Sequence, residues 1–139
     1  MRRAVFLGAL SVLAVFHLGY VGASAKEKTQ PRWGPFTAYS GARRLCQEHV
    51  LGKNLEISWQ TYATVDPIAQ VVAFYEKDLG KKAEAGNNGD FTLHGTVKVD
   101  DVITIYRVEK AEAHPSCAEK AKPGERTVIL VAQATPRAK

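Results

Sequence analysis

The sequence is poor in the residue patterns from which catalytic, redox and metal sites are built. It has two cysteines and four histidines in 139 residues, with no C-x-x-C pair, no H-E-x-x-H motif and no C-x-x-C-H heme-attachment motif. It also lacks a G-x-S-x-G nucleophile elbow and a phosphate-binding glycine loop. We therefore predict no catalytic residues, no cofactor and no metal site.

Basic residues do not gather into a stripe. The closest basic pairs are Arg43-Arg44 and Lys81-Lys82, and the formal charge of +5 falls to +3 when Arg2 and Arg3 are left out. This pattern does not favour nucleic-acid binding.

The chain has no Asn-x-Ser/Thr glycosylation acceptor, which fits a protein of a bacterial cell envelope.

Residues 1–25 have the features of a secretory signal peptide. Two arginines precede an apolar run from Ala4 to Val21, and Ala23-Ser24-Ala25 is typical of a cleavage site. We expect a mature chain that begins at Lys26 and is exported to the periplasm or secreted. The alternative is that the apolar run is retained as an N-terminal anchor, which would be the chain's only membrane contact.

Cys46 and Cys117 are 71 positions apart and have one intramolecular way to pair. In an oxidising compartment an even cysteine count predicts a disulfide. Closing a loop of this length stabilises a fold by about 4 kcal/mol in the chain-entropy model. The alternative is a reactive thiol, which with His49 three residues later would resemble a Cys-His pair.

We expect one domain over residues 41–135, preceded by an extended aromatic and Pro/Gly-rich arm over 26–40 and followed by a tail over 136–139. Ser40 is a candidate N-cap and Gly52 a candidate C-terminal residue for a short helix over 41–51. Alternation of apolar and polar residues from Leu55 onwards predicts a strand.

The segment after this strand predicts the main helix. Asp66 is a candidate N-cap, Pro67 suits the first helical position and Gly80 the end. An apolar stripe runs between them at helical spacing, through Ile68, Val71, Val72, Tyr75 and Leu79. With Asp66-Pro67, Val71-Val72, Phe74-Tyr75 and Leu79-Gly80, residues 62–80 resemble the strand-to-helix junction of small exported bacterial α+β domains of uncharacterised function. The resemblance implies an envelope α+β domain and assigns no site residues.

Three further strands are predicted, over 91–99 with a bend at Gly95, over 102–108 and over 127–134. Residues 86–89 are expected to form a turn, Asp100-Asp101 a hairpin tip, and 109–126 a long connection. The fold class is therefore α+β: a largely antiparallel sheet of about four strands packed by one main helix, with a short N-terminal helix and one disulfide. The expected core includes Trp59, Val72, Tyr75, Ile103, Ile105 and Leu130.

These observations favour an exported, non-catalytic structural or binding module of the bacterial cell envelope. Its partner would be an envelope protein or a small ligand. The candidate binding surface is the arm at Trp33, Phe36 and Tyr39, or the sheet face that the helix leaves uncovered. One alternative is a small secreted hydrolase using His114 or His49 in a loop-lined cleft, and another is a protein that handles metal or heme.

Overall fold

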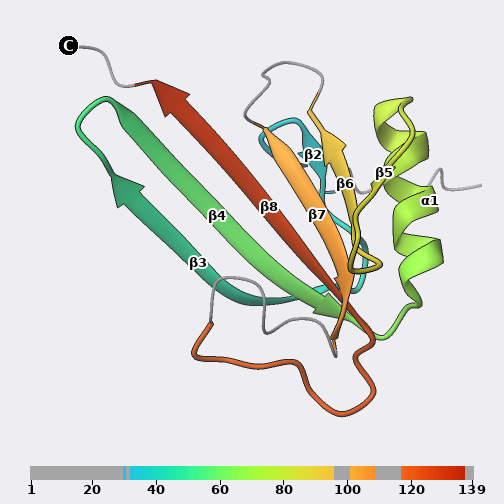
Figure 1. The fold of residues 1–139 in the computed structure, drawn as a ribbon. Coiled ribbons are helices and arrows are strands. Elements are labelled where there is room, and N and C mark those ends of the chain that lie inside the picture. Colours follow the sequence, from blue (N-terminus) through green and yellow to red (C-terminus); the bar gives the residue numbers. More distant parts are fainter. Residues whose placement is uncertain (1–29, 31, 96–100, 109–116, 137–139) are drawn as a thin grey trace, which may run out of the picture.

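The computed structural model describes residues 30, 32–95, 101–108 and 117–136. Along the chain these residues form eight strands and one helix (Figure 1). The elements are β1 (Arg32–Trp33), β2 (Phe36–Thr37), β3 (Arg43–Leu51), β4 (Leu55–Thr64), α1 (Ile68–Leu79), β5 (Glu84–Ala85), β6 (Phe91–His94), β7 (Val102–Arg107) and β8 (Thr127–Pro136).

The large sheet has six strands in the order β3-β4-β8-β7-β6-β5, and every neighbouring pair is antiparallel. β1 and β2 form a separate two-stranded sheet. The predicted helix-and-antiparallel-sheet layout is confirmed. The expected count of about four strands is too low for two reasons. The segment predicted as a short helix is strand β3, and β5 adds one more strand at the other edge of the sheet.

Helix α1 forms where the apolar stripe predicts it, and four members of that stripe are buried: Val71, Val72, Tyr75 and Leu79. The helix ends at Gly80, whose left-handed backbone (φ 64°) suits a residue without a Cβ. The expected capping role of Asp66 is wrong. Pro67 occupies the N-cap position, and the Asp66 carboxylate accepts a hydrogen bond from the Tyr39 hydroxyl instead.

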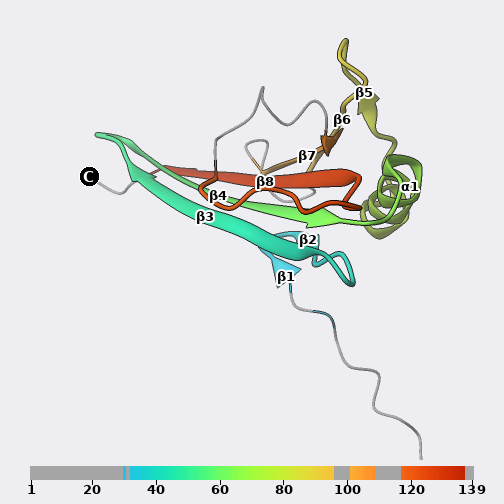
Figure 2. The ribbon, with the colours of Figure 1, turned by 90° about the horizontal axis from the view of Figure 1, so that it is seen from below.

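One face of the sheet, the helix face, carries the core. Helix α1 packs against β7, β6 and β2, so the helix and the arm lie on the same side of the sheet. The Thr37 hydroxyl donates to Asp78 of α1 at 2.7 Å and joins the two. Figure 2 shows β1 and β2 as a layer beside the large sheet. The core consists of Phe36, Tyr39, Tyr62, Val71, Val72, Tyr75, Leu79, Leu93, Ile103, Ile105, Ile129 and Val131.

The helix expected over 41–51 does not form, and this prediction is wrong. Residues 43–51 are β3, which pairs with β4 from Arg43↔Ala63 to Leu51↔Glu56. A tight turn closes this hairpin, with the Gly52 N–H donating to the Leu55 carbonyl at 2.8 Å. Pairing with β4 outweighs the helical propensity of this segment, because propensity alone is worth a few tenths of a kcal/mol per residue.

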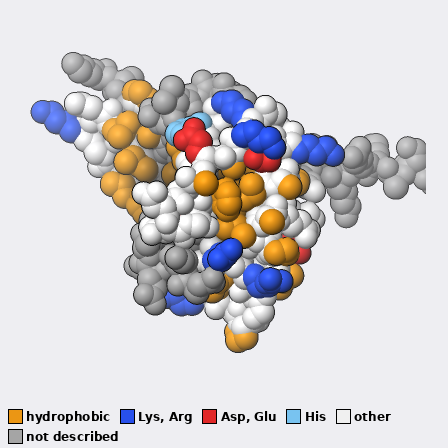
Figure 3. Space-filling view, turned by 45° about the vertical axis from the view of Figure 1, so that its right-hand side comes forward, with side chains coloured by type: hydrophobic (Ala, Val, Ile, Leu, Met, Phe, Trp, Pro, Cys, Tyr) orange, Lys and Arg blue, Asp and Glu red, His pale blue; other side chains and the backbone are white. Residues whose placement is uncertain are grey.

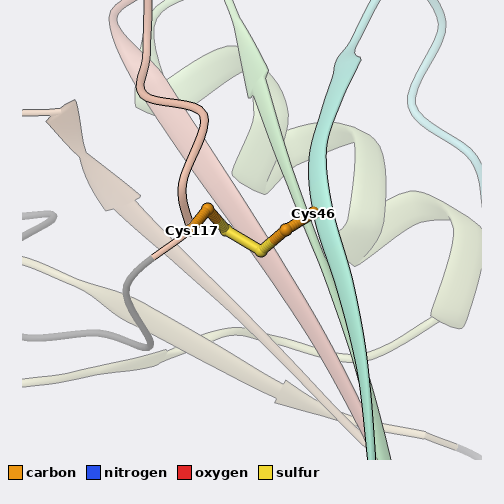
Figure 4. The surroundings of a disulfide bond; sticks show 2 residues. All are labelled: Cys46 and Cys117. Atoms are coloured by element: carbon orange, nitrogen blue, oxygen red, sulfur yellow. A yellow bond between two sulfur atoms is a disulfide. The ribbon is translucent and has the colours of Figure 1, made fainter.

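The Cys46–Cys117 disulfide is present, with its Cα atoms 5.5 Å apart (Figure 4). It ties the segment 117–126, which we call the strap, to β3. Arg43 strengthens this attachment through ion pairs with Glu119 and Glu125. A buried disulfide of this kind is compatible with an oxidising, exported location.

The opposite face of the sheet, the open face, carries neither α1 nor the arm. Near the strap it is closed, since Thr61, Ala63 and Val128 are buried. Farther along it is partly exposed, so Trp59 and Leu130 are half-buried and their assignment to the core is wrong. Figure 3 shows hydrophobic side chains at the left of the view, where β3, β4 and β8 extend away from α1.

The remaining strand predictions are confirmed within a few residues by β4, β6, β7 and β8. The expected turn at 86–89 joins β5 to β6, with Gly89 at φ 73°. The expected strand extension through Val97 and Val99, Asp100 of the expected hairpin tip and the first part of the long connection lie outside the described residues. Asp101, also expected at that tip, is buried directly before β7, and its carbonyl accepts a hydrogen bond from the Gly95 N–H, so its placement at the tip is wrong. Within the part of the chain that the structure describes, no helix is long and apolar enough to cross a membrane.

Candidate binding hollow at the aromatic arm

The arm is held on the helix face by its own turn and by one buried ring. Gly34, at φ 61°, turns the chain between β1 and β2 and lies directly against the Gln133 side chain of β8. The left-handed backbone favours glycine at this position. A Cβ atom there would come within 1.6 Å of Gln133 Nε2, so a larger residue would also have to displace the end of the Gln133 side chain. Phe36 is completely buried beneath α1 and anchors the hairpin. The turn at Gly34 and the Phe36 ring thus attach the arm to the helix face.

Between the arm and the start of β3 lies a surface hollow of about 590 Å³. Three aromatic rings, one arginine, and small or uncharged residues surround it. They are Gln30, Trp33, Ala38, Tyr39, Ser40, Gly41, Ala42, Arg44 and Tyr62. A volume of this size lies within the range of small-ligand sites.

The floor of the hollow is a stacked pair of rings. Trp33 of β1 lies parallel to Tyr62 of β4, with ring centroids 3.7 Å apart and planes 11° apart. Tyr62 is buried, whereas Trp33 is only half-buried. One face of Trp33 is therefore covered by Tyr62, and the indole remains accessible from the hollow. The stack holds the indole in a fixed orientation, which reduces the entropy lost when a ligand packs on it.

Tyr39 forms a wall of the hollow and uses its hydroxyl elsewhere. The hydroxyl donates to Asp66 Oδ2 at 2.8 Å, and the ring packs edge-on against Phe74 of α1 at 5.1 Å. Burial, together with the nearby Asp66 carboxylate, raises the pKa of Tyr39 to about 12. Tyr39 therefore stays protonated in the physiological range and presents ring surface, not charge, to the hollow.

Arg44 is the single charged residue among the described residues that line the hollow. It is exposed and its Nη1 donates to Gln47 Oε1 at 3.3 Å, a long and weak contact. Burial raises the pKa of Tyr62 to about 12, and the positive charge of Arg44 works against this shift. Arg44 thus gives the hollow a positive field next to the Trp33–Tyr62 stack.

The structure places the three predicted surface residues differently. Trp33 and Tyr39 line the hollow, whereas Phe36 is in the core. Sequence reasoning missed Tyr62 and Arg44, which complete the site from β4 and β3. Tyr62 falls in the predicted strand, but the sequence does not show that the arm packs on the face of the sheet to which this residue points.

The residues weighed for catalysis do not come together. Cys46 is oxidised, and the described residues contain no free cysteine. His49 is half-exposed and pairs with Glu56, with Nε2 and Oε1 2.9 Å apart. His94 lies at the end of β6, and His114 lies outside the described residues. Among the residues described, no group of three or more His, Cys, Asp and Glu side chains is placed to hold a metal ion.

Comparisons with protein-family models, with curated proteins and with solved structures find nothing that matches this chain. The hollow therefore has to be interpreted from its own chemistry.

Proposed function

We propose that this protein is an exported, non-catalytic binding module whose site is the hollow at the arm, and that its ligand is an acidic saccharide. The observation that carries the proposal is the stack of Trp33 on Tyr62, 3.7 Å apart, with Arg44 lining the same hollow. A flat, fixed indole beside one guanidinium suits a ring-shaped ligand with one acidic group.

Each part of the hollow would contact a different part of such a ligand. The apolar face of a sugar ring would pack on Trp33, as flat apolar surfaces do on aromatic rings. Its carboxylate would accept two parallel hydrogen bonds from the Arg44 guanidinium, the geometry that distinguishes arginine from lysine. Ser40 and Gln30, at the rim, would supply hydrogen bonds to hydroxyl groups.

The charge of the hollow supports an anionic ligand over a neutral or cationic one. No carboxylate is among the described residues that line it. Asp66, on the far side of Tyr39, is already engaged by the Tyr39 hydroxyl. An anion in the hollow would therefore meet Arg44 without a competing negative charge.

Export supports the ligand class. The predicted signal peptide at 1–25 and the Cys46–Cys117 disulfide both favour an oxidising compartment outside the cytoplasm. Acidic saccharides are components of cell-envelope polymers, so a module in that compartment would meet them.

The test uses the fluorescence of Trp33. The Trp59→Phe variant leaves Trp33 as the only tryptophan of the folded domain, because the chain has two tryptophans in all. Titration with trigalacturonic acid should change the emission of this variant, whereas the fully methyl-esterified trimer should bind at least tenfold more weakly. Arg44→Gln should weaken binding of the acid to the level of the ester.

The matched control is Arg107→Gln, which removes a described exposed arginine outside the hollow. It should bind trigalacturonic acid as the parent does. Equal affinity for the acid and the ester, or equal losses in Arg44→Gln and Arg107→Gln, would contradict the proposal.

A further inference from the structure

Strand β3 is one edge of the six-stranded sheet, and its nine residues pair with β4 on one side only within the described chain. A long free edge exposes a row of unpaired N–H and C=O groups that favours pairing with another strand. We propose that the outer half of β3, residues 47–51, pairs antiparallel with the same segment of a second copy and forms a two-fold dimer.

The two halves of β3 differ in how they are protected. The inner half has a bulge between Arg44 and Cys46, and the disulfide and the Arg43 ion pairs attach it to the strap. Bulges and covering segments are the usual protection of sheet edges. Among the residues that the structure describes, no segment covers the outer half, from Gln47 to Leu51, and its register with β4 is regular. Its sequence Q-E-H-V-L contains no proline and no lysine.

The hairpin turn determines which backbone groups of this half point outward. The Gly52 N–H donates to the Leu55 carbonyl, so the backbone of Gly52 points toward β4. Along an antiparallel strand, successive residues direct their backbone N–H and C=O groups alternately toward and away from the neighbouring strand. No irregularity interrupts the pairs from Leu51↔Glu56 to Gln47↔Gln60. Leu51, His49 and Gln47 therefore direct their N–H and C=O groups away from the sheet.

One two-fold register uses all of these groups. With His49 opposite His49 of the second copy, Gln47 faces Leu51 of the second copy, and about six main-chain hydrogen bonds form. A register centred on Glu48 places two carboxylates directly opposite, which is unfavourable. A register centred on Gln47 brings the bulge at Leu45 into the pairing.

The side chains agree with the register centred on His49. Val50 and Leu51 are 48% and 59% exposed, which is high for large apolar side chains. In the dimer Val50 lies diagonally next to Val50 of the second copy on the open face, which buries part of both. On the helix face, each His49 keeps its own Glu56 at 2.9 Å.

The pairing buries one short strand from each copy, less than the area of a typical stable complex. The dimer should therefore form in a concentration-dependent way. The hollow is built from the inner end of β3, so this inference does not depend on the proposed ligand.

Sedimentation equilibrium of the purified protein, with its N-terminus determined by mass spectrometry, tests the proposal. The wild type should pass from monomer to dimer between micromolar and low millimolar concentration. His49→Pro, which removes an outward N–H at a position where an edge strand tolerates proline, should weaken the dimer at least tenfold. The matched variant His49→Ala keeps that N–H and should change the dissociation constant less than threefold.

Cross-linking tests the register without relying on the proline variant. In the dimer the two Cα atoms at position 49 are about 5.5 Å apart, within disulfide range. Those at position 51 are displaced by about 13 Å along the strands. Mild oxidation should therefore cross-link His49→Cys and leave Leu51→Cys uncross-linked. A monomer at every concentration, or equal cross-linking of both variants, would overturn the proposal.

Discussion

Two buried threonines on neighbouring strands should respond with opposite sign to the same substitution. Thr61 of β4 and Thr127 of β8 are 2% and 0% exposed, so both hydroxyls lie in the interior of the domain. Thr127 Oγ1 donates to the Asp66 carbonyl at 2.7 Å. Thr61 Oγ1 has no hydrogen-bond partner among the described residues. Valine has nearly the same shape as threonine and suits a strand, so it isolates the contribution of the hydroxyl.

At Thr61 the substitution removes a buried hydroxyl that finds no hydrogen bond in the described part of the chain, so Thr61→Val should raise the free energy of unfolding by about 1–2 kcal/mol. At Thr127 it removes a satisfied hydrogen bond and leaves the Asp66 carbonyl unpaired. Thr127→Val should therefore lower the free energy of unfolding by about 1–2 kcal/mol. In a domain of this size each kcal/mol corresponds to a change in Tm of about 4 °C or more.

Urea unfolding followed by circular dichroism measures both variants, with m-values compared to confirm that the unfolded state is unchanged. Thr61→Ser is the control, since it keeps the hydroxyl and should not stabilise the fold. If Thr61→Val were as destabilising as Thr127→Val, the Thr61 hydroxyl would have a partner in solution and the reasoning would fail.

Three further outcomes are expected from the core, the disulfide and the ion pair at the strap. Val72→Ala should lower the free energy of unfolding by about 1–3 kcal/mol in urea melts, because Val72 is buried between α1 and the sheet. Replacing Cys46 and Cys117 together by serine should lower it by about 4 kcal/mol, and wild type under reducing conditions should match that variant. The Arg43 guanidinium holds the pKa of Glu125 below its ordinary value of 4.5. The ion pair therefore stabilises the fold above that pH and loses this effect as the pH falls below it, and Arg43→Gln should remove this part of the pH dependence of Tm.

The elements predicted correctly are those in which local pattern and tertiary environment agree. The stripe from Ile68 to Leu79 has helical spacing, a proline before it and a glycine after it, and α1 forms there with that stripe facing the sheet. The runs that became β7 and β8 are rich in β-branched residues and are central strands, where such residues are favoured.

The segment that became β3 shows why local pattern fails elsewhere. Residues 43–51 contain helix-favouring residues between Ser40 and Gly52, and neither end of the segment forbids a helix. The deciding signal is the turn at Gly52-Lys53-Asn54, which folds the segment back onto β4. Read as a hairpin turn, this tripeptide would have predicted a strand on both of its sides.

The candidate site depends on a feature that period-two alternation does not reveal. Cys46 pairs with Thr61 and faces the open side, so strict alternation would also direct Arg44 to the open side. The bulge between Arg44 and Cys46 adds one residue to β3, and Arg44 pairs with Tyr62 instead. This change of face turns the guanidinium toward the stack of Trp33 and Tyr62, whereas Cys46 still reaches the strap. Bulges commonly reorient a side chain next to a functional site, and here one extra residue lets β3 serve the disulfide on one face and the hollow on the other.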